Sequence, residues 1–180
     1  MKKKILLMAI ALMSIGITNT AMAQKQETGT ASASAYIINP IAINKTVDMS
    51  FGNIAIGTGV GTVLIAPSSE GGLTIGGDAF IPATGGSSAA AKFTISGENS
   101  YTYTITIPTG DHTITHTNTT DVMIVNNFTS SIGTGAGDGF LDASNGNQVL
   151  YVGATLNISG DQLTGSYASL TAFDVKVNYN

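Results

Sequence analysis

Cysteine, tryptophan and arginine are all absent from this 180-residue sequence, and only 10% of its residues are charged. Without cysteine the chain can form no disulfide, and the bacterial lipoprotein route, which acylates a cysteine, is closed to it. All seven basic residues are lysines, which are too few and too scattered to build the basic patch that nucleic acid or anionic lipid requires. We therefore expect no nucleic-acid partner.

The first 23 residues have the pattern of a secretory signal peptide. Lysines at 2–4 precede an apolar run at 5–17, and Ala21 and Ala23 form a small-x-small cleavage site ahead of Gln24. The apolar run is shorter than the ~20 residues that a membrane-spanning helix needs. We expect export to the periplasm, the cell surface or the extracellular space, with no membrane span after the signal is removed.

Removal of the signal (residues 1–23) leaves 157 residues, which suits a single domain. Four lysines against eleven acids give this mature chain a net charge of −7. Residues 24–34 are small and polar, and predict a flexible lead or a donor-like segment. Residues 35–180 are expected to form one domain.

Strand signals fill the mature chain from residue 35 onward, and no convincing amphipathic helix interrupts them. The expected strands are 35–43 with a break at Pro40, 47–51, 61–66, 73–75, 89–95, 101–107, 122–128, 149–152, 154–158 and a terminal strand from Phe173. Strands 89–95 and 101–107 are predicted to form a hairpin. The run "GTGVGT" (57–62) predicts a hairpin or bulge, and Asn145-Gly146 a tight turn. About 8–10 short strands at this spacing predict an all-β fold, an immunoglobulin-like or Greek-key antiparallel β-sandwich.

The terminal strand alternates apolar and polar residues to the end of the chain. Phe173, Val175, Val177 and Tyr179 share one face, which we expect to lie against the core whether the strand is an ordinary part of a sheet or an assembly edge.

Few residues point to metal chemistry. His112 and His116 lie in a threonine-rich stretch that favours a strand, where residues four apart stand ~13 Å from each other, too far to chelate one ion. Asp138, Asp142 and Asn145 lie in a glycine-rich loop and are the candidate calcium ligands. The bidentate acid that closes a hand-type calcium loop is missing there. We expect no cofactor.

Catalytic signals are also weak. The two histidines share one stretch without a nucleophile motif, and the absence of tryptophan removes most aromatic platforms for sugars. We expect no enzymatic activity.

Five blocks of the chain, in this order, resemble the secreted bacterial domain-of-unknown-function 4402 family. They are "YIINPIAINKTVDMSFGNI" (36–54), "GTV" (61–63), "AAAKFTISGENSYTYTITIP" (89–108), "MIVNNF" (123–128) and "LYVGATLNISGDQLTGSYASLTAFDVKVNYN" (150–180). The resemblance implies a single exported β-sandwich and brings no catalytic residues. Departures at Ala154 and at 170–172 leave the start of the last strand open.

The end of the chain is also similar, more loosely, to major subunits of bacterial fimbriae, which often finish on an alternating strand with a penultimate tyrosine like Tyr179. In that class a neighbour's N-terminal arm supplies a missing strand. Residues 31–37 alternate small apolar and polar side chains, so the lead is either such an arm or the first strand of its own domain. The fimbrial disulfide is missing here.

Two functions follow as expectations. The first is an exported, non-catalytic structural or adhesive protein, a fimbria-like subunit whose partners are further copies or a periplasmic chaperone. The alternative is a periplasmic or secreted glycan-binding module, with calcium as an aid.

Overall fold

The computed structural model describes residues 25–84 and 86–180. The expected signal peptide and its cleavage residues Ala21 and Ala23 lie outside the described residues. The chain divides into two units at Tyr36/Ile37. We refer to residues 25–36 as the arm and to residues 37–180 as the domain. The arm forms neither helix nor strand, and its side chains are exposed.

Eleven strands and no helix are found among the described residues of the domain. The strands are β1 (Ala42–Val47), β2 (Ala55–Ile65), β3 (Leu73–Phe80), β4 (Ala91–Ser96), β5 (Thr102–Thr106), β6 (His112–His116), β7 (Val122–Ser130), β8 (Gly139–Phe140), β9 (Asn147–Ile158), β10 (Tyr167–Ser169) and β11 (Lys176–Tyr179). In the part of the chain that is described, no helix is long and apolar enough to cross a membrane.

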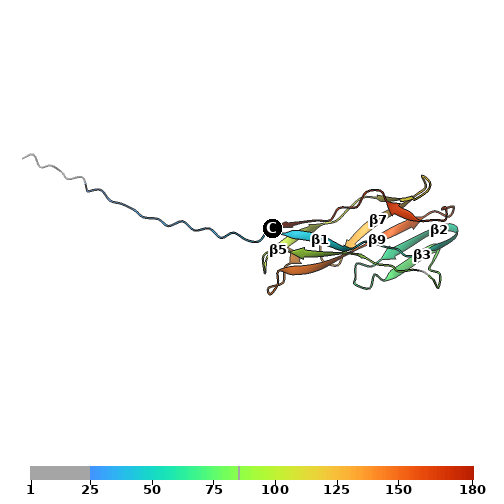
Figure 1. Cartoon of the computed structure of the whole chain (residues 1–180), viewed down its shortest axis with the longest axis horizontal. Coiled ribbons are helices and arrows are strands. Elements are labelled where there is room, and N and C mark those ends of the chain that lie inside the picture. Colours follow the sequence, from blue (N-terminus) through green and yellow to red (C-terminus); the bar gives the residue numbers. More distant parts are fainter. Residues whose placement is uncertain (1–24, 85) are drawn as a thin grey trace, which may run out of the picture. The chain divides into compact units, whose positions relative to one another are not determined.

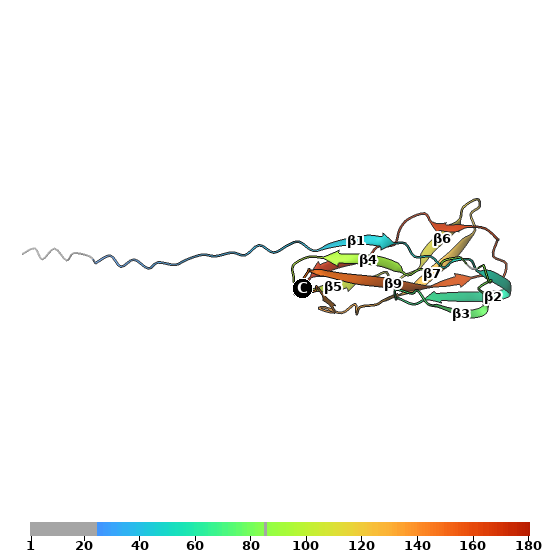
Figure 2. The ribbon, with the colours of Figure 1, turned by 60° about the horizontal axis from the view of Figure 1, so that its bottom comes forward.

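The twelve-residue strand β9 is the central strand of an eight-stranded antiparallel sheet. Its first half pairs with β4 and its second half with β2, while β7 lies along its other side. Strands β6 and β10 follow β7, β1 borders β4, and β3 borders β2. Figure 1 shows β9 along the middle of the domain, with β2 and β3 at one end and β1 and β5 at the other. In Figure 2, β1, β4 and β9 follow one another across the sheet.

A second sheet, in the order β11-β5-β8, supplies the opposing layer. One hydrophobic core joins the two sheets: Tyr103 and Ile105 of β5 are at most 1% exposed and belong to the same cluster as Ile95, Leu150 and Val152 of the larger sheet. Burial also raises the pKa of the Tyr103 hydroxyl to about 12. The antiparallel β-sandwich predicted from the sequence is therefore confirmed.

The predicted hairpin between 89–95 and 101–107 is wrong. Strand β4 belongs to the eight-stranded sheet and β5 to the other sheet, so the chain crosses between layers instead of pairing with itself. Residues 97–101 turn sharply at Ser100, whose φ is 65°. Both strands have alternating apolar faces, and these two faces meet across the core. The sequence pattern alone does not distinguish this arrangement from a hairpin.

Other strand predictions were correct in kind but not in extent. Pairing begins at Ala42, just after Pro40, and the two strands expected at 149–158 are the single strand β9. The glycine-rich run at 57–62 contributes to an irregularity in β2, where the register shifts between Ile56 and Gly61. The terminal strand starts at Lys176, three residues later than the alternation indicated.

Candidate functional site

A groove of about 710 Å³ opens between the irregular segment 48–54 and residues 165–169, which include the short strand β10. Its floor is apolar and comes from the inward faces of β6, β7 and β9, namely Ile114, Met123, Val125 and Leu156. Val125 and Leu156 are 3% exposed, so the floor is part of the core itself. The groove is a place where the second layer of the sandwich is incomplete.

The first rim, residues 48–54, was expected to contain a strand at 47–51, and that prediction is wrong. Within the described chain, Ser50 alone in this segment exchanges backbone hydrogen bonds, with Ala89 at 2.9 and 2.8 Å. The hydroxyl of Ser50 donates to the Ser87 carbonyl at 3.0 Å, and the Asn53 amide donates to the Thr84 carbonyl at 3.1 Å. The segment is thus hydrogen-bonded to residues 84–89, while Met49, Phe51 and Ile54 pack against the core.

The second rim is fixed by a cluster around Asp121. The hydroxyl of Tyr167 donates to Asp121 Oδ2 at 2.6 Å, and Gln162 Nε2 donates to the same oxygen at 2.5 Å. The hydrogen bond from Tyr167, followed by those from the Leu163 backbone and Gln162 and by the charge of His116, lowers the pKa of Asp121 against a smaller opposing effect of burial. The pKa of Tyr167 is raised, first by burial and then by its bond to Asp121.

The two histidines lie on β6, as the threonine-rich stretch predicted, and each has its own partners. His112 Nε2 lies 2.9 Å from Ser169 Oγ, and its ring meets Phe128 and Phe173 edge-on. His116 is buried, lies 3.2 Å from the Thr164 carbonyl, and packs edge-on against Tyr167. Both histidines therefore attach β6 to the chain that follows β9.

The candidate calcium ligands lie on either side of β8. Asp138 Oδ2 accepts a hydrogen bond from the Gly135 backbone at 2.6 Å. Asp142 Oδ1 accepts from the Ser144 hydroxyl and the backbones of Ser144 and Asn145, and the Ser144 hydroxyl contributes most to lowering the pKa of Asp142. Both carboxylates thus close their own loops. Across residues 25–84 and 86–180, no group of three or more acidic or histidine side chains could hold a metal ion.

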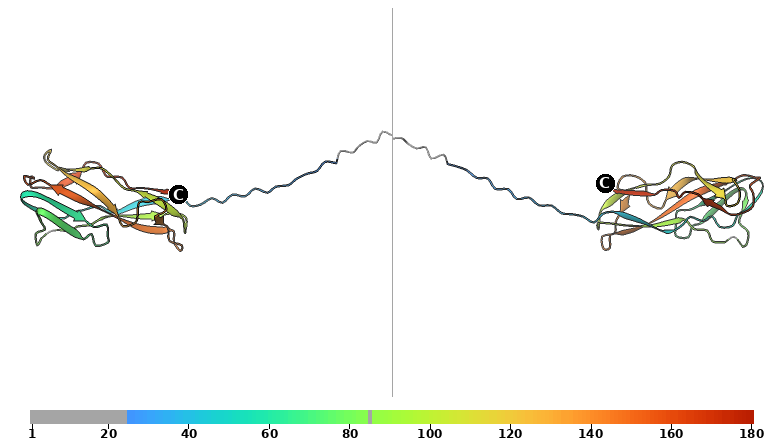
Figure 3. Two further views of the ribbon diagram at one scale, coloured as in Figure 1. Left: turned by 180° about the vertical axis from the view of Figure 1, so that it is seen from behind. Right: turned by 45° about the horizontal axis from the view of Figure 1, so that its top comes forward.

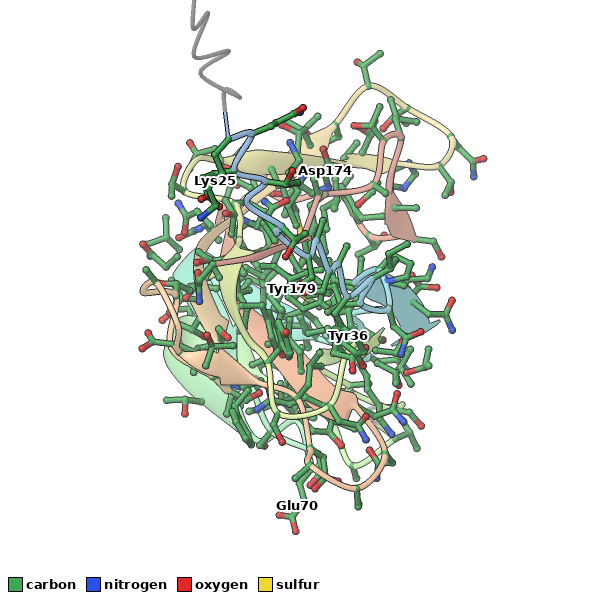
Figure 4. The ribbon with its side chains drawn as sticks, turned by 90° about the vertical axis from the view of Figure 1, so that its left-hand side faces the viewer. Lys25, Tyr36, Glu70, Asp174 and Tyr179 are labelled. Carbon is green, nitrogen blue, oxygen red and sulfur yellow. The ribbon has the colours of Figure 1, made fainter. Side chains whose placement is uncertain are left out.

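The closing strand β11 pairs with β5 along its whole length, from Lys176 opposite Thr106 to Tyr179 opposite Tyr103. Phe173, Val175, Val177 and Tyr179 are half-buried and pack against the core, while the alternate residues are exposed. The chain terminates at the same end of the domain in both views of Figure 3. In Figure 4, which looks at that end, Tyr179 lies among other side chains, whereas Glu70 points outward at the lower edge of the view.

The sequence did not predict a cluster of hydrogen bonds around Tyr179. The Tyr179 hydroxyl donates to the Asn39 carbonyl at 2.9 Å and accepts from the Glu98 backbone at 2.6 Å. The backbone and side-chain amides of Asn39 both donate to Glu98 Oε2 at 2.9 Å. These three residues are far apart in the sequence, so no local pattern identifies the cluster. It fixes the point at which the chain enters β1.

Among the described residues, five strands have a partner strand on one side only. These are β1, β3 and β10 in the larger sheet, and β8 and β11 in the smaller one. Their unpaired backbone edges are the other surface on which a further chain segment can add.

Comparison with known proteins identifies a family for this domain. Neither a curated protein nor a solved structure matches the chain. A family model does match, over residues 41–179, which includes every strand of both sheets. The chain therefore belongs to the family described as Domain of unknown function (DUF4402).

Proposed function

We propose that the protein is an exported, non-catalytic structural or adhesive protein whose copies assemble through strand edges, in the manner of a fimbria-like subunit. The observation that carries the proposal is the set of strands, β1 and β11 among them, that are paired on one side only. An unpaired edge presents a row of backbone donors and acceptors to which a strand of another chain can add.

The edges are protected against indiscriminate pairing. Lys45 of β1 and Lys176 of β11 are exposed, and Pro40 lies just ahead of β1. Charged side chains and proline on edge strands discourage uncontrolled association, and β8 and β10 are only two and three residues long. Assembly of this protein therefore requires a specific partner segment.

Sedimentation of the purified chain from Gln24 onward tests the proposal. We expect polymers or oligomers whose fraction rises with protein concentration, with or without the chaperone of the exporting cell. A chain that stays monomeric at millimolar concentration, with the periplasmic extract of its host added, would contradict assembly.

Mass spectrometry of the exported material should give a chain that begins at Gln24.

A glycan-binding module is the second candidate, and the groove of about 710 Å³ is the observation that favours it. Ligand sites commonly have this size, with an apolar lining and a few polar groups. Ser166 and Ser169, which carry hydroxyl groups, line one rim. A monomeric chain that binds oligosaccharides on a glycan array, more tightly when millimolar calcium is added, would favour this function over assembly.

A further inference from the structure

We propose that the groove between residues 48–54 and 165–169 accepts the arm of a second copy of the chain as an added strand. The inference rests on the proposed function, because it names the surface and the partner segment through which copies would assemble. It does not use the edges of β1, β3, β8 or β11.

The groove has the chemistry of a site for an extended peptide. Its floor is apolar, and Ile114 and Met123 on that floor are only partly buried, so a strand laid over them would remove apolar surface from water. In the described chain, Ser50 is the one residue of the rim at 48–54 whose backbone is hydrogen-bonded to another backbone, that of Ala89. A strand added here completes the second layer of the sandwich.

The arm has the chemistry of the missing strand. It forms no helix or strand, and alanines at 31, 33 and 35 alternate with Ser32, Ser34 and Tyr36. No charged residue occurs from Thr28 to Tyr36, so burial of this stretch requires no desolvation of a charge. Alanine side chains are small enough for the backbone of the arm to lie close to the floor.

The arm of a second copy fits the groove better than the arm of the same copy. Asn39 is held by hydrogen bonds to Glu98 and Tyr179 at the start of β1. The groove begins at Asp48, just past the far end of β1. The six residues of β1 separate it from the start of that strand by roughly 20 Å. The same copy's arm would have to turn back along β1, whereas a second copy's arm has no such constraint.

Two matched substitutions in the arm test which of its faces is buried. In the full mature chain, Ala33→Glu should weaken assembly at least tenfold in sedimentation experiments, because it places a carboxylate over the apolar floor. Ser34→Glu adds the same charge to the opposite face and should change assembly less than threefold. Equal effects of the two substitutions, or none, would overturn the proposal while leaving assembly through another edge intact.

Disulfide trapping tests where the arm binds. No native cysteine can form a competing disulfide, because the chain has none. A mixture of Ala33→Cys and Ser166→Cys chains should form a mixed disulfide dimer on oxidation, whereas Thr74→Cys on exposed β3 should not trap Ala33→Cys. A chain that carries both Ala33→Cys and Ser166→Cys should not close on itself at nanomolar concentration. Polymers without the mixed disulfide, or efficient closure within one chain, would refute the proposal. A wild-type chain that never associates would refute the proposed function itself.

Discussion

Val177 and Asn178 are neighbours on β11 that face opposite sides of the smaller sheet. Val177 packs against the core, whereas Asn178 is exposed. Val177→Asp should lower the free energy of unfolding by at least about 2 kcal/mol, because it replaces apolar burial with an unpaired charge. Asn178→Asp introduces the same group on the wet face and should cost less than about 0.5 kcal/mol. Urea unfolding of dilute protein measures both; similar losses would mean that the strand has the opposite register.

The carboxylate of Asp121 should make stability depend on pH in the acid range. Its pKa in the folded protein lies below the ordinary 3.8, mainly because the Tyr167 hydroxyl donates to it. The resulting stabilisation is fully present above pH 3.8 and is lost as the pH falls through the lower, folded value. Tyr167→Phe should therefore raise the pKa of Asp121 toward its ordinary value and flatten the acid dependence of the melting temperature.

An NMR titration of the Asp121 side-chain carbonyl measures this shift directly. Tyr151→Phe is the matched control, since the Tyr151 hydroxyl is not among the groups that shift the pKa of Asp121. The pKa of Asp121 should not change in this variant. If Tyr167→Phe also left that pKa unchanged, the attribution to the Tyr167 hydrogen bond would be wrong.

At the residue scale, the alternation of apolar and polar side chains along a strand was the most useful signal in the sequence. The side chains at 173, 175, 177 and 179 have the common inward orientation that period-two alternation implies. Asn39, Glu98 and Tyr179 gave no such signal, because their hydrogen bonds join residues 59 to 140 positions apart. Long-range polar contacts depend on the folded topology, which a single sequence does not display.

At the scale of strands, the end of β2 lies close against its neighbour β9 at a glycine. A Cβ on Gly153 would lie 2.1 Å from the Ile65 carbonyl oxygen and 2.8 Å from the Pro67 nitrogen. These are backbone atoms at the end of β2, which cannot rotate away as a flexible side chain can. Gly153→Ala should therefore lower the free energy of unfolding by about 2 kcal/mol or more.

Gly72→Ala is the matched control for this prediction. Nothing lies within 4 Å of a Cβ at Gly72, so the substitution should be neutral or slightly stabilising, by up to about 1 kcal/mol. Thermal unfolding of both variants checks the pair. Equal stability of the two would show that the end of β2 moves freely against β9.

Strand existence was easier to predict from the sequence than strand pairing. The stretch at 112–116 forms β6, as its threonines indicated, and Asn145-Gly146 forms a turn, with Gly146 at a φ of 64°. Residues 47–51 have the alternation of a strand, but β1 ends at Val47 and the segment 48–54, which connects β1 to β2, lines one rim of the groove. The groove was therefore not predictable, since it arises where an expected strand is missing.

At the scale of the whole molecule, removal of residues 24–34 separates the two roles that the sequence left open for this stretch. The family match begins at residue 41, and no residue of the arm belongs to a strand. The truncated chain should therefore keep its melting temperature within a few degrees, while the proposed assembly should be lost and the chain should sediment as a monomer. Circular dichroism and sedimentation measure the two quantities. Loss of folding would show that this stretch is the domain's own first strand.

The pairing of β11 with β5, a strand far earlier in the sequence, has a consequence for the order of folding. Strand β5 lies between β11 and β8, and its pairing with β11 joins residues 103–106 to residues 176–179. The pairing of β4 with β1 needs only residues 42–96, whereas the smaller sheet also needs residues 176–179. Until β11 is in place, β5 lacks a neighbour on one side, so formation of the smaller sheet is a slow long-range step during which this edge is open to mispairing.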